Sequence, residues 1–137
     1  MQASPFLELT GMRIVEMSAT SAVVELTVTK ELLQGLGVLH GGMTGALIDT
    51  AIGAAVWAAA GGKSPYVSIE FKVNHFQPAR LDDVLTTTAE VLHRGRSTAA
   101  GHARVTNQHG KLIAHGTGTY MRVTGALTRV TNDATPT

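Results

Sequence analysis

The chain has 137 residues, of which 44% are hydrophobic and only 15% charged, and its net charge at pH 7 is +1. Enough apolar residues are present for one domain with a buried core, which excludes an intrinsically disordered chain. The balanced charge argues against a general nucleic-acid binder, and the absence of cysteine excludes disulfides and thiolate chemistry.

The same counts lead to expectations about location and assembly. Residues 1–10 lack the basic cluster and apolar run of a secretory signal, and together with the absence of cysteine this predicts a cytoplasmic protein. So small a domain has few charged side chains to spread over its surface. We therefore expect further copies of the chain to cover part of that surface.

The first half of the chain predicts two strands, a loop and a long helix. Residues 12–17 and 22–29 form the strands, and in the second of these apolar and polar residues alternate. Residues 30–40 form a loop interrupted by glycines. Residues 41–60 form the long helix, which ends at a pair of glycines.

The helical segment is apolar on nearly every side, as expected of a helix buried in a core. Residues 43–61 are long enough to cross a membrane, but they are mostly Ala, Gly and Thr and include Asp49 near the middle. We therefore expect no membrane span. The many small residues indicate that a neighbouring element packs closely against this helix.

Four further strands are predicted at 65–76, 84–93, 97–107 and 111–123. In the first of them apolar and polar residues alternate, which places the two sets on opposite faces. The apolar set is Val67, Ile69, Phe71 and Val73, and the polar set is Ser68, Glu70, Lys72 and Asn74. The whole pattern predicts one α+β domain over residues 1–123, with a sheet wrapped around the helix, and a mobile tail at 124–137.

Asp49 is a carboxylate on an otherwise apolar helix. Burying such a group costs free energy unless it is paired or functional, and desolvation makes a carboxylate a stronger base. A structural role is equally open, in which Asp49 lies at a subunit edge and bonds to a neighbouring backbone or to an arginine.

Gly41 and Gly42 open the same helix. Free N–H groups and the positive end of the helix dipole at this point can bind a carbonyl oxygen that is becoming an oxyanion, although a plain loop-to-helix junction would look the same. Gly41 and Asp49 are eight positions apart, which is roughly 12 Å along a helix axis. If both are catalytic, Gly41 must meet Asp49 of a second subunit, which predicts a two-fold dimer with two shared sites.

The segment Gln34…His40-Gly41-Gly42…Asp49, followed by Val67-Ser68-Ile69-Glu70-Phe71…Gln77-Pro78-Ala79, resembles a known family. It is similar to the hotdog-fold acyl-CoA thioesterases, especially those of the phenylacetate-degradation type, from about Glu25 to Val123. The resemblance implies a hotdog fold, with an antiparallel sheet wrapped around one long central helix. It also implies hydrolysis of an acyl- or aryl-acyl-CoA thioester by a homodimer or homotetramer.

The resemblance also implies roles for individual residues. Asp49 matches the carboxylate that acts as general base or nucleophile, and Gly41 matches the glycine whose N–H polarises the thioester carbonyl. Gln34 stands where the phenylacetate type often has Asn, a small departure toward the hydroxybenzoyl-CoA thioesterases, which in turn often have Glu at the place of Asp49. Ser68 matches a Ser or Thr that holds the attacking water, and a plain role as a solvated or packed strand residue is equally open. Gly53 stands where some relatives have a Thr, so that role cannot be met there.

A second set of residues is expected to bind substrate: His40, Gly42, Arg94 and Arg96. His40 could instead hold backbone groups at the helix entry, which we favour, and Gln34 could serve only to tie down its loop. The two arginines could meet CoA phosphates or lie on a solvated turn, and the turn is the preferred interpretation.

The remaining histidines show no spacing typical of metal ligands, so we predict no metal site. They are His75, His93, His102, His109 and His115. No cofactor is expected either, because a thioester already carries a good leaving group. Two other functions on the same fold stay open: a module that binds acyl-CoA without cleaving it, and a dehydratase.

Overall fold

A computed structural model describes residues 4–125 of the chain, so most of the expected tail at 124–137 lies outside the described residues. The predicted strands and the long helix are all present, with ends that agree to within two residues. The elements, in chain order, are α1 (Pro5–Thr10), β1 (Arg13–Met17), β2 (Ser21–Thr27), the short 3₁₀ helix η1 (Lys30–Leu32), α2 (Gly41–Ala59), β3 (Tyr66–His75), β4 (Val84–Arg94), β5 (Thr98–Thr106) and β6 (Leu112–Arg122).

Helix α1 was not expected from the sequence. Ser4 caps its N-terminus by accepting a hydrogen bond from the Leu7 N–H, Pro5 occupies the first turn, and Gly11 ends it with a φ of 82°. These are recognisable signals of a helix start and stop. The helix has only six residues, too few for an apolar period to be seen.

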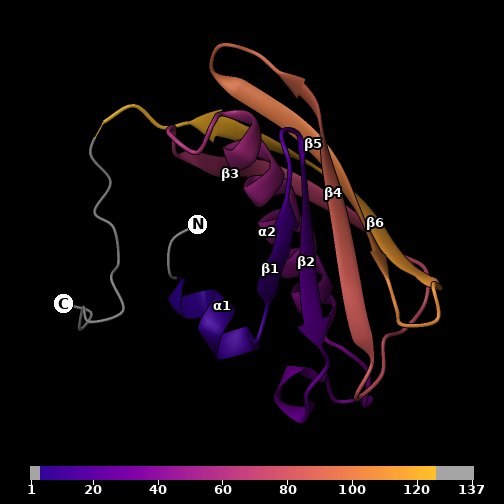
Figure 1. Cartoon of the computed structure of the whole chain (residues 1–137). Coiled ribbons are helices and arrows are strands. Elements are labelled where there is room, and N and C mark those ends of the chain that lie inside the picture. The colour runs from indigo at the N-terminus through magenta and orange to yellow at the C-terminus, as the bar shows by residue number, and fades with distance from the viewer. Residues whose placement is uncertain (1–3, 126–137) are drawn as a thin grey trace.

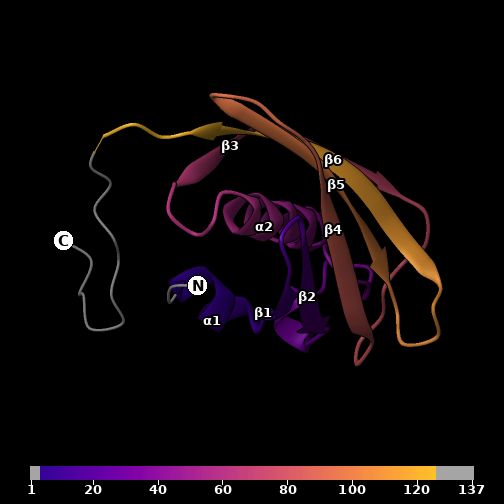
Figure 2. The same cartoon turned by 45° about the horizontal axis from the view of Figure 1, so that its top comes forward.

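The six strands form one antiparallel sheet in the order β1-β2-β4-β5-β6-β3. The sheet curves around α2, which crosses its concave face (Figures 1 and 2). This arrangement confirms the expected α+β fold class. Because the order places β3 next to β6 and leaves it without a second neighbour, β3 is an edge strand, as is β1 at the other side.

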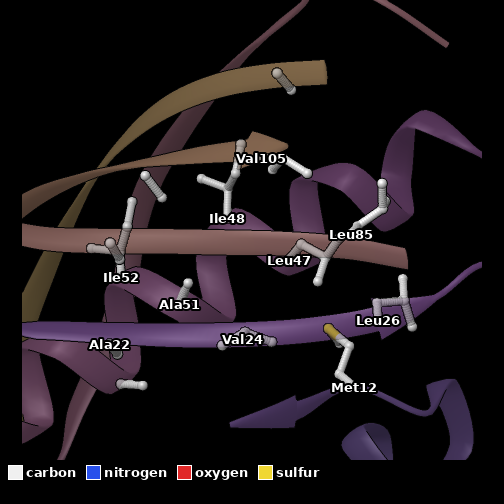
Figure 3. Close-up of a cluster of buried hydrophobic side chains, with 14 of the residues drawn as sticks. Met12, Ala22, Val24, Leu26, Leu47, Ile48, Ala51, Ile52, Leu85 and Val105 are labelled. Atoms are coloured by element: carbon white, nitrogen blue, oxygen red, sulfur yellow. The ribbon is translucent and has the colours of Figure 1, made fainter. Parts of the chain in front are cut away.

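Helix α2 is the core helix of the domain. Its buried residues pack with Val24 and Leu26 of β2 and with Leu85 and Val105 of the central strands (Figure 3). By length and composition alone, the helix could cross a membrane. Half of it is buried inside the domain, which agrees with the expectation of a core helix rather than a span.

Glycines in the central strands allow the helix to approach the sheet closely. A Cβ at Gly101 would lie 2.8 Å from Cγ2 of Ile52, and a Cβ at Gly116 would lie 2.9 Å from Cγ2 of Ile48. Neither position has room for a side chain. The close partner indicated by the small residues of the helix is therefore the glycine-containing centre of the sheet.

The expected alternation along β3 is wrong at its N-terminal end. The register with β6 shifts between Ser68 and Glu70, so that Ser68 pairs with Tyr120 while Phe71 pairs with Gly118. A bulge adds one residue to a strand and reverses the facing of everything beyond it. Ser68 therefore shares the helix-facing side with Phe71, and Val67 lies on the opposite side, contrary to the prediction from period two.

Candidate active site

A cavity of about 330 Å³ lies at the N-terminus of α2. Its polar lining includes Gln34 from the loop before the helix, Gly41 and Thr44 from the first turns, and His75 from the end of β3. The imidazole of His75 lies beside Gly41, since a methyl group added there would be 3.4 Å from Cε1 of His75. In the sequence His75 is one of several scattered histidines, because only the tertiary fold brings the end of β3 to the helix start.

The backbone donors at the helix start are assigned to different partners. The N–H of Gly42 donates to Nδ1 of His40 at 2.9 Å, and the N–H of Met43 donates to the main-chain oxygen of His40 at 2.9 Å. The N–H of Thr44 reaches the same oxygen at 3.4 Å. Within residues 4–125, the N–H of Gly41 has no hydrogen-bond partner. The helix start thus offers one free donor, and it belongs to a residue that lines the cavity.

His40 acts as the cap of α2 through its Nδ1 atom, in agreement with the helix-entry role that we favoured. Gln34 has a comparable structural bond, because its Oε1 accepts a hydrogen bond from the N–H of Leu36. This bond ties Gln34 into its own loop. The side-chain amide of Gln34 still has its donor group, and the residue lines the cavity.

Asp49 is bonded to Tyr120 on β6. The hydroxyl of Tyr120 donates to Oδ1 of Asp49 at 2.7 Å and lies 2.8 Å from the main-chain oxygen of Asp49. Burial raises the pKa of the Tyr120 hydroxyl far above its usual range, and the hydrogen bond to Asp49 raises it further. The hydroxyl is therefore a neutral donor at physiological pH.

Tyr120 was not singled out in the sequence, although a signal was present. It lies on the inward-facing side of its strand, and a tyrosine in such a place usually finds a partner for its hydroxyl. The partner itself could not be named, because it lies 71 positions earlier in the chain. Ser68 is paired with Tyr120 across the two strands, so the two residues lie on the same face of the sheet.

The two halves of the predicted site do not meet within one protomer. Gly41 and Asp49 both belong to α2, and eight positions of helix separate them by roughly 12 Å.

Arg94 and Arg96 lie at the turn between β4 and β5. The main-chain oxygen of Ser97 in this turn accepts a hydrogen bond from the N–H of Arg122, and Arg122 pairs with Tyr66 at the start of β3. This is the Ser68 end of the sheet, away from the cavity at the His75 end.

On the outer face of the sheet, two of the histidines come together. Nδ1 of His102 and Nε2 of His115 are 3.0 Å apart, and Glu90 lies 3.6 Å from the other nitrogen of His102. Burial lowers the pKa of His115, and the nearby His102 lowers it further. Across the described part of the chain, no group of three or more His, Cys, Asp or Glu residues is arranged to hold a metal ion.

An antiparallel sheet wrapped around one central helix, with a free backbone donor at the helix start, defines a hotdog-fold protein suited to polarising a carbonyl group. The family model of the thioesterase superfamily matches residues 36–114. The chain belongs to this family and is a thioester hydrolase. This assignment favours an enzyme over a module that binds acyl-CoA without cleaving it.

Relatives support the same assignment. The acyl-coenzyme A thioesterase PaaI of Escherichia coli is 32% identical over 86% of this chain and 82% of its own. Human acyl-coenzyme A thioesterase 13 is 33% identical over 75% of this chain and 74% of its own. These likenesses confirm the resemblance to acyl-CoA thioesterases of the phenylacetate-degradation type.

Solved structures resemble the whole domain. The structure of Escherichia coli PaaI, from the phenylacetic acid degradation operon, has a TM-score of 0.84 at 30% identity and covers 91% of this chain and 88% of its own. A thioesterase from Streptococcus pneumoniae, solved with coenzyme A, has a TM-score of 0.76 at 29% identity over 82% of this chain and 85% of its own. The hotdog fold expected from the sequence is thereby confirmed.

Proposed function

We propose that this protein hydrolyses an acyl- or aryl-acyl-CoA thioester to a free acid and CoA. The observation that carries the proposal is the unpartnered N–H of Gly41 on the wall of the cavity at the start of α2. A donor at this place, at the positive end of the helix dipole, suits a thioester oxygen that becomes negatively charged during attack. The names of the relatives point to the same substrate class.

The reaction proceeds by attack of water on the thioester carbonyl. Asp49 accepts a proton from the water as its oxygen bonds to the carbonyl carbon, and Ser68 holds the water in place. The N–H of Gly41 stabilises the oxyanion. The carbon–sulfur bond then breaks, and CoA leaves as a thiolate that takes up a proton. Direct attack by the Asp49 carboxylate is the alternative first step, and no metal or cofactor is required for either.

Each active site takes Gly41 from one subunit and Asp49 from another. The exposed edge strand β3 supports this assembly, because 42% of Val67, 53% of Ile69 and 44% of Phe71 are exposed along it. A two-fold axis pairs β3 with its own copy in antiparallel fashion, so that the Ser68 end of one strand lies beside the His75 end of the other. We propose a homodimer with this geometry, or a homotetramer of two such dimers, in the cytoplasm.

The remaining predicted residues have supporting roles in this scheme. Gln34 orients the thioester from the wall of the cavity, while His40 and Gly42 shape the helix start on which the carbonyl rests. Arg94 and Arg96 are exposed cations at the Ser68 end of the sheet. There they meet the phosphates of CoA bound at the shared site.

Thioester cleavage should depend on the Asp49 carboxylate. The test is release of free CoA from a panel of short, long and aromatic acyl-CoAs by the wild type and by Asp49→Asn and Asp49→Ala. We expect both variants to lose roughly 100- to 10,000-fold in kcat on every substrate that the wild type cleaves. Asp82→Asn, which changes an exposed carboxylate in a loop, serves as the control and should keep full activity. Near-normal turnover by Asp49→Ala would refute the assignment.

A further inference from the structure

Near the end of β6, the hydroxyl of Tyr120 contacts the central helix at Asp49. Only 3% of Tyr120 is exposed, and its hydroxyl is within hydrogen-bond distance of both Oδ1 and the main-chain oxygen of Asp49. Because an ionised carboxylate and a carbonyl only accept hydrogen bonds, the phenol is the donor. Oδ2 of Asp49 has no hydrogen-bond partner within residues 4–125.

Two glycines make room for the tyrosine ring, one on each element that the ring connects. A Cβ at Gly118 of β6 would lie 3.0 Å from Cε2 of Tyr120, and a Cβ at Gly53 of α2 would lie 3.6 Å from Cε1. Gly53 is one turn of helix beyond Asp49. The ring thus fills the space beside the carboxylate, and close packing holds the hydroxyl at one position.

We propose that Tyr120 is a positioning residue for thioester hydrolysis: it binds Oδ1 of Asp49 and so directs Oδ2 toward the attacking water. The inference rests on the proposed function, in which Asp49 activates that water. An exposed aspartate samples several side-chain rotamers, whereas a carboxylate anchored at one oxygen presents the other in a fixed direction. Orientation of this kind is a large part of what a protein adds to a base, since a small misplacement can cost about 100-fold in rate.

Tyr120 is the side chain that donates a hydrogen bond to the Asp49 carboxylate. Other charged groups nearby are Glu70 and Lys72 on β3. Their register with Thr119 and Thr117 places both on the outer face of the sheet, and Glu70 accepts a hydrogen bond from Thr119 there. The ionisable side chain bonded to Asp49, among the described residues, is thus Tyr120.

The test is Tyr120→Phe, which keeps the ring and removes only the hydroxyl. We expect kcat to fall roughly 10- to 100-fold with KM changed less than about threefold, since the substrate is bound elsewhere and only the base is misplaced. Tyr66→Phe is the matched control, because Tyr66 is the only other tyrosine in the sequence, and it should leave both quantities unchanged.

Stability is recorded by thermal melting, so that the kinetics are compared where both variants are folded. A purely structural Tyr120 would lower the melting temperature and leave kcat as in the wild type, which would overturn the inference. In an Asp49→Asn background, Tyr120→Phe should have little further effect on residual turnover, and a full additional loss would also overturn it.

The two proposals fail in different ways. If Asp49→Asn retains normal turnover, then the proposed function of Asp49 is wrong and Tyr120 has no catalytic partner to position. If Asp49→Asn is inactive while Tyr120→Phe is kinetically normal at every pH, only the role of Tyr120 is wrong.

Discussion

At the start of α2, three backbone N–H groups form capping hydrogen bonds with His40, and the N–H of Gly41 does not. The side chain of His40 accepts a hydrogen bond from the N–H of Gly42, and its main-chain oxygen accepts from the N–H groups of Met43 and Thr44. These bonds stabilise the first turn of the helix. The N–H of Gly41 is left over and faces no protein acceptor within residues 4–125. The capping bonds therefore hold a free donor rigidly in place, as stabilisation of an oxyanion requires.

Gly41→Pro tests this donor directly. Proline suits the first position of a helix and lacks only the N–H, so the helix should form normally. We expect kcat to fall roughly 100- to 1,000-fold, as for loss of one oxyanion donor. Gly41→Ala is the matched control, because it keeps the N–H, and its added Cβ makes an ordinary 3.4 Å contact with His75. Equal activity of the two variants in a free-CoA release assay would show that the donor is not used.

At the scale of elements, the helix and the sheet fit because small residues stand opposite branched ones. Gly101 and Gly116 lie in the two strands beneath α2, against Ile52 and Ile48 of the helix. The position at Gly116 is closed on both sides, since a Cβ there would also come within 2.5 Å of the main-chain oxygen of Lys72 on the neighbouring strand. A backbone atom cannot move aside as a flexible side chain can.

Gly116→Ala should therefore destabilise the domain by about 1–3 kcal/mol, through overpacking between helix and sheet. Gly53→Ala is expected to do the reverse and stabilise by up to about 1 kcal/mol, because alanine favours a helix over glycine. The new methyl group at Gly53 has space, at 3.6 Å from Tyr120. Chemical denaturation of both variants beside the wild type measures the two changes, and equal stability of all three would contradict the packing argument.

At the scale of the whole molecule, the edge strand β3 offers a reason for the proposed division of each site between two protomers. The strand has the cavity residue His75 at one end and Ser68, next to Tyr120, at the other. Large apolar side chains are exposed between these ends, beside the charged Glu70 and Lys72. Pairing with a second β3 would cover these side chains and complete both sites.

Charges on β3 should therefore break the assembly and the activity together. We expect the double variant Ile69→Lys, Phe71→Lys to elute as a monomer in size-exclusion chromatography with light scattering, and to lose at least about tenfold in kcat/KM. Leu9→Lys is the control, since Leu9 is an exposed apolar residue on α1, with 83% of its surface accessible. If the double variant were monomeric and fully active, the proposed shared site would be wrong.

A mixed dimer gives an independent check of the same geometry. Co-expression of Asp49→Asn with Gly41→Pro produces heterodimers in which one shared site carries both changes and the other carries neither. Random pairing should restore roughly a quarter of the wild-type activity, although each variant alone is nearly inactive.

The sequence by itself determined the six strands, the central helix and the fold class, and it pointed to most of the residues proposed for the site. Apolar periodicity is a local property, so the strands and the buried helix could be placed within two residues. The helix start and Asp49 stood out for the same reason, because a glycine pair and a lone carboxylate are conspicuous on an apolar segment.

Only the tertiary structure decided which residues meet. The bulge in β3 depends on pairing with β6, and it moved Ser68 to the side of the helix against the period of its own strand. Tyr120 meets Asp49, and His75 meets Gly41, through contacts between residues that are far apart in the chain. No local pattern encodes such contacts, because they arise from how a curved sheet closes around its helix.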